Sequence, residues 1–190
     1  MILSSNQQQD IQVIDKNLNQ ITDLIHEKLH IWVHYEVFSW QWWIGLCITI
    51  IPWFVWYAVS RNNLNRDRFL FAGFLTLIIS VALDVIGDQY GLWHYRFNIL
   101  PILPTYFPWD FTLMPVTIMI FLQIKPNANP FVKSFLFALF ASFVGEPLFY
   151  WIDSYNPIHW RFIYSVPIQI FIYLIAYYFC KTRSKIHTFA

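Results

Sequence analysis

The stretch FLFAGFLTLIISVALDVIGDQY, residues 69–90, decides the fold class. It runs from Phe69 to Leu83 without a charged side chain, which is long enough for most of a helix that crosses the hydrocarbon core of a bilayer. Four more segments have a similar apolar character, at 41–59, 108–124, 131–152 and 162–180. We therefore predict an all-α, polytopic transmembrane bundle with about five spans.

The composition of the whole chain agrees with a membrane location. Hydrophobic residues make up 57% of the 190 residues and charged residues only 12%, whereas about 25% of an average soluble domain is charged. The formal net charge is +1, so the chain has no basic field with which to bind a polyanion. We expect no nucleic-acid partner.

The first 38 residues form a separate, polar segment. Its apolar residues recur at helical spacing on one face, which predicts an amphipathic helix; they are Ile11, Ile14, Leu18, Ile21 and Ile25. Such a helix lies on lipid headgroups or on the bundle, or it forms a short homodimer zipper. The predicted organisation is an N-terminal helical segment at 1–38, a transmembrane domain at 39–182 and a polar cytoplasmic tail at 183–190.

Charges in the loops predict the orientation of the chain. With five crossings, the loops at 60–68 and 125–133 and the C-terminal tail fall on one side and carry most of the Lys and Arg residues. We expect the protein in the cytoplasmic membrane. The positive-inside rule then predicts that the C-terminus faces the cytoplasm. Pro101 and Pro104 resist a regular helix, so we expect 97–107 to be irregular, partly re-entrant and shielded by the rest of the protein.

Three acids lie in or at the start of apolar segments, and they are the candidate catalytic residues: Asp84, Asp110 and Glu146. An acid at that depth costs several kcal/mol unless it is paired, protonated or wet, so it is a functional candidate. The alternative is a buried pair of the acid with Arg or His that locks the bundle. Asp110 also suits a helix cap. Gly145 and Pro147 flank Glu146, which predicts a local backbone irregularity there.

Two loops of similar sequence, GLWHYRF at 91–97 and PIHWRF at 157–162, follow the segments that carry Asp84 and Glu146. They suggest a weak internal duplication with a site between the repeats, in the outer half of the bilayer. The candidate binding residues are Asp88, Trp93, His94, Arg96, His159, Trp160 and Arg161. Interfacial anchoring by the Trp residues and snorkelling by the Arg residues are the competing interpretations.

The common catalytic motifs are absent from the sequence: there is no HExxH, CxxC, GxSxG or glycine-rich phosphate loop. His26, His30 and His34 share one helical face without a clear carboxylate partner, so a solvated or interfacial stripe is favoured over a weak zinc site. We predict no metal and no cofactor.

The stretch DVIGDQYGLWHYRFNILPILP at 84–104, continuing to PWDF at 108–111, resembles a family of small, uncharacterised multi-spanning proteins of spore-forming Gram-positive bacteria. Over roughly 84–123 it is more distantly similar to the lycopene cyclase domain. That similarity implies acids that protonate a polyene and start its cyclisation. The cyclase pattern has paired glutamates after a proline, and LPTYFPWDF here offers the single acid Asp110.

Three functions follow as expectations. The first is an outer-leaflet acidic and aromatic pocket that binds a membrane lipid, an isoprenoid or a membrane partner, with homo-oligomers formed through the N-terminal helix. The second is an isoprenoid cyclase that uses acid-initiated carbocation chemistry. The third is a small transporter or proton relay that uses the same acids.

Overall fold

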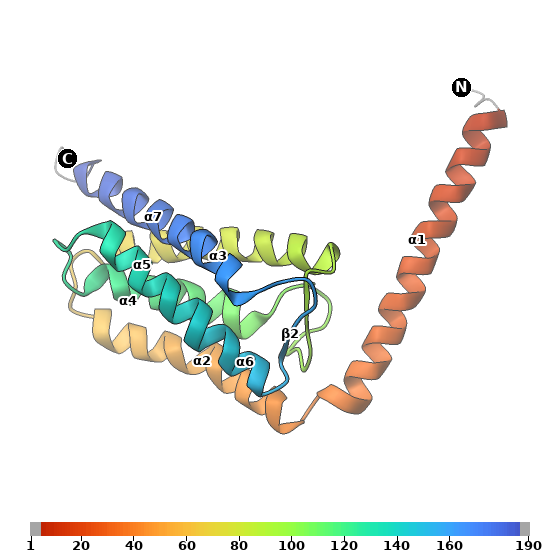
Figure 1. Cartoon of the computed structure of the whole chain (residues 1–190), viewed down its shortest axis with the longest axis horizontal. Helices are drawn as coiled ribbons and strands as arrows, with labels where there is room; N and C mark the ends of the chain where they lie inside the picture. The colour runs from red at the N-terminus through yellow and green to blue at the C-terminus, as the bar shows by residue number, and fades with distance from the viewer. Residues whose placement is uncertain (1–4, 187–190) are drawn as a thin grey trace.

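The computed structural model describes residues 5–186 and consists almost entirely of helices (Figure 1). The predicted all-α bundle is confirmed, with one two-stranded ribbon as the addition. In chain order the elements are α1 (Ser5–Ile31), the π-helical η1 (Trp32–Glu36), α2 (Trp40–Ser60), α3 (Arg66–Gln89), β1 (Trp93–Tyr95), the π-helical η2 (Pro108–Leu113), α4 (Met114–Gln123), α5 (Pro130–Phe140), the π-helical η3 (Ala141–Gly145), α6 (Glu146–Trp151), β2 (Tyr155–Pro157) and α7 (Phe162–Ile186).

Four helical stretches of the described chain are long and apolar enough to cross a membrane: Trp40–Ser60, Arg66–Gln89, Pro130–Trp151 and Phe162–Thr182. The protein is therefore a multi-pass membrane protein. The fifth predicted segment is also helical, but η2 and α4 together cover only 108–123. At 1.5 Å per residue they reach about 24 Å, less than the roughly 30 Å hydrocarbon core. The irregular 97–107 segment precedes η2 in the chain.

The connections between the helices gather at two ends of the bundle (Figure 1). The α2–α3 and α4–α5 connections and the end of α7 lie together at one end, and β1 and β2 lie at the opposite end. The basic loops of the sequence therefore share one end, as five passages of the chain require. β1 pairs antiparallel with β2, with Tyr95 opposite Tyr155, so the two similar loops contact each other.

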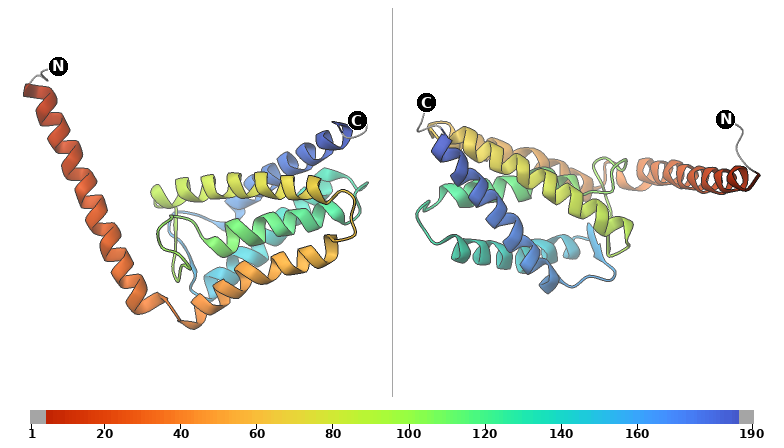
Figure 2. Two further views of the ribbon diagram at one scale, coloured as in Figure 1. Left: turned by 180° about the vertical axis from the view of Figure 1, so that it is seen from behind. Right: turned by 90° about the horizontal axis from the view of Figure 1, so that it is seen from above.

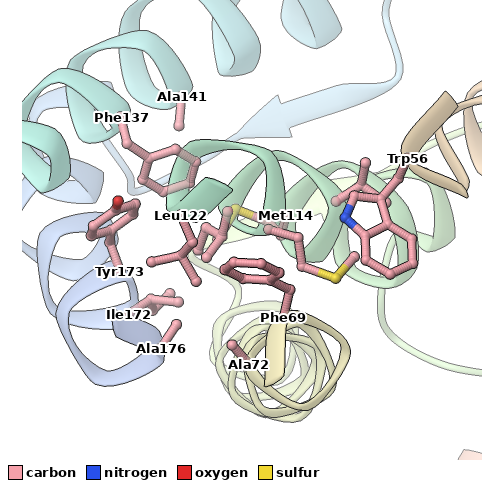
Figure 3. Close-up of a cluster of buried hydrophobic side chains, with 13 residues drawn as sticks. Trp56, Phe69, Ala72, Met114, Leu122, Phe137, Ala141, Ile172, Tyr173 and Ala176 are labelled. Atoms are coloured by element: carbon pink, nitrogen blue, oxygen red, sulfur yellow. The ribbon is translucent and has the colours of Figure 1, made fainter. Parts of the chain in front are cut away.

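The short helix α4 occupies the centre of the bundle and organises the hydrophobic core (Figure 3). Ile118 and Met119 of this helix are fully buried. A Cβ at Gly73 of α3 would lie only 2.6 Å from the Met119 sulfur, so the glycine lets these two helices approach closely. Small residues serve this purpose in membrane helix packing, where lipid supplies no hydrophobic driving force.

Helix α1 projects away from the bundle and crosses the direction of the bundle helices steeply (Figures 1 and 2). This arrangement rules out the expectation that α1 lies on the bundle, and it leaves the membrane surface or a second copy to cover the apolar stripe. The connection to the bundle is made by η1. The Trp32 indole donates to the carbonyl oxygen of Asn98 at 2.6 Å, and the Asn98 N–H donates to Glu36 Oε2 at 2.8 Å.

Two predicted boundaries change in the structure. The expected irregularity of 97–107 is confirmed up to Tyr106, and Pro101, Thr105 and Tyr106 are buried in it. Helix α7 continues to Ile186, beyond the predicted start of the tail at 183. The rest of the predicted tail, 187–190, lies outside the described residues.

Candidate functional site

A cavity of about 180 Å³ lies between α3, α6, α7 and the β1–β2 ribbon, and we call it the polar cavity. The carboxyl groups of Asp84 and Glu146 both line it, although these residues come from helices far apart in the sequence. Its other polar and aromatic lining residues include Trp93, Tyr155, Trp160 and Gln169. Two of the three candidate acids therefore line one shared cavity.

Asp84 is buried and surrounded by hydrogen-bond donors. Its Oδ1 accepts from the Trp93 indole at 3.1 Å and from the Tyr95 hydroxyl at 2.9 Å. Its Oδ2 accepts from the backbone N–H of Tyr106 at 3.4 Å. Burial raises the pKa of Tyr95 well above its usual range, so the phenol keeps the proton that it donates. These contacts tie α3 to β1 and to the irregular 97–107 segment.

Asp110 has no exposed surface and does not line the polar cavity. The hydroxyl groups of Ser80 and Thr105 donate to its two carboxyl oxygens. Its carboxyl group also interacts directly with that of Asp84. Because Asp110 lies inside η2, it joins α3, the 97–107 segment and the central helix. These contacts are those of a residue that holds neighbouring segments together. The catalytic role of Asp110 stays a prediction.

Glu146 differs from the two aspartates because part of its carboxyl group is free. The side chain is 8% exposed, and Oε2 has no hydrogen-bond partner among residues 5–186. The Ser165 hydroxyl interacts with the same carboxyl group. Gln169, one helical turn beyond Ser165, is 6% exposed, and its Oε1 likewise lacks a partner in this part of the chain. Two residues of the cavity lining thus each hold a buried acceptor oxygen without a donor in residues 5–186.

The π-helical segments place two of the candidate acids. Asp110 lies within η2, and Glu146 follows η3 directly, which confirms the irregularity predicted around Gly145 and Pro147. A π-helical turn inserts an extra residue and re-aims the side chains that follow it, and such turns often occur at functional sites. The Trp109 ring fills the space beside Gly145, where a Cβ would lie 2.8 Å from it.

Stacked aromatic rings form the walls of the polar cavity. The rings of Trp93 and Trp160 meet edge to face at 4.8 Å, and those of Tyr95 and Tyr106 stack at 4.9 Å. Burial, followed by the nearby carboxyl groups of Glu146 and Asp84, raises the pKa of Tyr155, so this phenol is neutral. These ring contacts hold the walls in one arrangement before any ligand enters.

The other predicted binding residues lie outside the cavity. Asp88 pairs with His94 at 2.8 Å, and Arg96 lies 3.9 Å from the exposed Asp153. His159 and Arg161 are exposed. No basic side chain therefore pairs with Asp84 or Glu146, and donors from Trp, Tyr, Ser and the backbone take that place in the described chain. Of the predicted binding residues, only Trp93 and Trp160 line the cavity.

A second cavity, of about 360 Å³, adjoins the first between α2, α4 and the α5–η3–α6 helix, and we call it the apolar cavity. Cys47, Val144 and Leu148 are among its lining residues, which include no charged side chain. Trp109 and Phe149, whose rings meet edge to face at 5.7 Å, border both cavities. A polar and an apolar chamber thus share one aromatic wall.

Several residues of the site were missed by reasoning from the sequence: Ser80, Thr105, Tyr106, Tyr155, Ser165 and Gln169. Ser80 lies one helical turn before Asp84, and Ser165 and Gln169 lie one turn apart in an apolar segment. Polar side chains at such spacing inside a span are a usable signal. Thr105 and Tyr106 carry no such signal, because the irregular backbone alone places them.

The fold and its two cavities define a multi-pass helical membrane protein with a buried acidic and aromatic site. Comparisons with protein-family models, with curated proteins and with solved structures find no match to this chain. Among the described residues, no group of three or more His, Cys, Asp or Glu side chains is arranged to hold a metal ion.

Proposed function

We propose that this protein binds a membrane lipid, with the head group of the lipid in the polar cavity and its hydrocarbon chain in the apolar cavity. The observation that carries the proposal is the pair of adjoining chambers, one lined by Asp84 and Glu146 and the other free of charged side chains. Small-molecule sites are concave and mostly apolar, with a few placed polar groups that orient the ligand. This pair of chambers meets that description for an amphipathic molecule.

The two acids contribute differently to this function. Asp84 is occupied by three donors and holds the wall in place. Glu146 offers an acceptor oxygen without a partner in the described chain. A buried acceptor left without a donor costs about 1–3 kcal/mol, and a ligand that donates a hydrogen bond recovers that cost. Glu146 is therefore the residue that orients the head group.

The proposed location is the cytoplasmic membrane, with the C-terminus in the cytoplasm and the polar cavity near the outer surface. The support is the shared position of the Arg61 and Lys125 loops at the end of the bundle where α7 ends, opposite the β1–β2 ribbon. A lipid of the outer leaflet would then reach the polar cavity first.

The test is purification of the full chain from its native membrane in a mild detergent, followed by mass spectrometry of bound lipid. Val144 lines the apolar cavity and is 52% exposed, so Val144→Trp adds bulk at the cavity's open side and should lower the bound lipid several-fold. Val132 lies on the same helical stretch, is 55% exposed and does not line the cavity. Val132→Trp is the matched control and should leave the amount unchanged. Equal lipid in both variants, or none in the wild type, refutes lipid binding.

A second candidate function is the isoprenoid cyclisation implied by the distant similarity to the lycopene cyclase domain. The free oxygen of Glu146 beside aromatic walls supports it, because aromatic faces stabilise cations. Protonated Glu146 would add its proton to a double bond, forming a C–H bond and a carbocation. Loss of a proton from the cyclised product to the carboxylate would restore the acid.

This candidate is tested by the products formed from a linear polyene. Cyclic isomers should appear with the wild-type protein and disappear with Glu146→Gln. Asp153→Asn, an exposed acid at the same end of the bundle, is the control and should keep them. The absence of cyclic isomers with the wild-type protein contradicts catalysis but leaves lipid binding standing.

A further inference from the structure

The charge of the polar cavity restricts the ligands that it accepts. Its lining includes two carboxyl groups, from Asp84 and Glu146, and no Lys, Arg or His side chain. Of the basic groups at that end, His94 and Arg96 pair with Asp88 and Asp153, and His159 and Arg161 are exposed. A cation in the cavity can take one of these carboxyl groups as its counter-ion, whereas a phosphate or carboxylate finds no basic side chain in the lining.

The free hydrogen-bonding atoms of the lining agree with the charge. Glu146 Oε2 and Gln169 Oε1 are acceptors, both belong to side chains more than nine-tenths buried, and neither has a partner among residues 5–186. An N–H or a positively polarised C–H group satisfies an acceptor, and another oxygen anion does not. The absence of a basic side chain from the lining and the unpartnered acceptors thus favour the same class of ligand.

The aromatic walls supply the third feature. Trp93, Trp160 and Tyr155 line the cavity, and pairs of rings are packed against one another at 4.8–5.4 Å. Faces of Trp and Tyr attract ammonium groups through the ring quadrupole, and the attraction grows when the site excludes water. A cavity of about 180 Å³ also has a suitable size, since an engineered cavity of about 150 Å³ holds benzene.

We infer that the polar cavity recognises a cationic amine, either a quaternary ammonium or a protonated amine, as the head group of its ligand. This inference rests on the proposed lipid-binding function and specifies the head group. The side chains of Glu146 and Gln169 provide oxygen atoms for the cation. The rings of Trp93, Trp160 and Tyr155 enclose it.

The test compares two probes of equal shape on the full chain in a detergent with a neutral head group. Choline carries the ammonium, and dimethylbutanol is its neutral isostere, in which a carbon atom replaces the nitrogen. Binding is followed by calorimetry, with the quenching of Trp fluorescence as a second signal. Choline should bind at least about tenfold more tightly than the isostere, because only the cation gains from the rings and carboxyl groups.

Two variants locate the effect. Glu146→Gln keeps the shape of the side chain and should remove most of the preference for choline. Asp153→Asn removes an exposed acid that lies outside the cavity and should retain the preference. If Glu146→Gln fails to fold, the comparison of the two probes on the wild-type protein still tests whether the cavity prefers a cation. Equal or stronger binding of the neutral isostere overturns the inference, as does a preference that Glu146→Gln leaves intact.

Failure of this inference and failure of lipid binding give different results. Bound lipid without any amine, together with equal affinity for both probes, rejects the cationic ligand and keeps the proposed function. Selective choline binding without any co-purified lipid supports the cation site and rejects the lipid. Binding of neither probe overturns the inference whatever lipid is found.

Discussion

Asp84 and Glu146 line one cavity, yet replacing the carboxyl group by an amide should affect stability at Asp84 more than at Glu146. Asp84 Oδ1 and Oδ2 accept from three donors, so an amide nitrogen at either position would face an N–H or O–H group. Glu146 Oε2 faces no donor of the described chain, and an amide there displaces nothing. The carboxyl group of Asp84 is thus held by its neighbours, whereas that of Glu146 keeps one oxygen without a donor in the described chain.

The first prediction concerns these two residues. Asp84→Asn should lower the free energy of unfolding by about 1–3 kcal/mol, because it leaves a buried donor unpaired. Glu146→Gln should change it by less than about 1 kcal/mol. Unfolding in a titration with a denaturing detergent, followed by circular dichroism, measures both. An equal loss in the two variants would show that Glu146 is also structural.

The second prediction concerns the contact between Gly87 and Trp93. A Cβ on Gly87 would lie 2.0 Å from the Trp93 indole, so Gly87→Ala must displace that ring and its hydrogen bond to Asp84. We expect a loss of about 1–3 kcal/mol, typical of overpacking, and a shift of the tryptophan emission. At Gly45 the added Cβ would meet its nearest atom at 3.4 Å, so Gly45→Ala is the control. Unchanged emission in Gly87→Ala would contradict the packing of Trp93.

At the scale of elements, η1 is the connection that fixes the 97–107 segment to the N-terminal helix. Trp32 and Glu36 bind the two backbone groups of Asn98. The same segment carries Thr105 and Tyr106, which bind Asp110 and Asp84. Near each end of the irregular segment, backbone groups of Asn98 and Tyr106 are therefore hydrogen-bonded, which non-helical chain at membrane depth requires.

The third prediction follows from Glu36. Burial raises the pKa of Glu36 above its ordinary value of 4.5, so the folded protein holds this proton more tightly than the unfolded chain. The stabilisation is fully present below that ordinary value and is lost as the pH rises through the raised pKa. Glu36→Gln keeps an acceptor for the Asn98 N–H but does not titrate.

The measurement is the unfolding temperature of both proteins as a function of pH. The wild type should become less stable relative to Glu36→Gln as the pH rises from about 4.5. A difference that stays constant over that range would show that folding does not change the pKa of Glu36.

At the scale of the whole molecule, the two ends of the bundle differ in chemistry. The α2–α3 and α4–α5 connections and the end of α7 gather the basic residues, and the β1–β2 ribbon closes the polar cavity at the other end (Figure 1). The positive-inside rule assigns the first end to the cytoplasm. The fourth prediction is therefore that Asn63 faces the cytoplasm and Gly91 the outside.

Labelling of single cysteines in intact cells measures this orientation. In a background with Cys47→Ser and Cys180→Ser, a thiol reagent that does not cross membranes should modify Gly91→Cys and spare Asn63→Cys. Both sites should react once the membrane is made permeable, which controls for accessibility. The reverse pattern would place the polar cavity on the cytoplasmic side.

The sequence by itself determined the helical membrane fold, because apolar length and the scarcity of charge leave no other way to bury this chain. It also indicated Asp84 and Glu146, since an acid inside an apolar run needs an explanation wherever it points. Only the tertiary structure decided that these acids share one cavity, that Trp and Tyr rather than Arg satisfy Asp84, and that α4 lies at the centre. Helical periodicity places a side chain on one face of a helix. The π-helical turns and the irregular 97–107 segment follow no simple period, and they determine which helix faces meet.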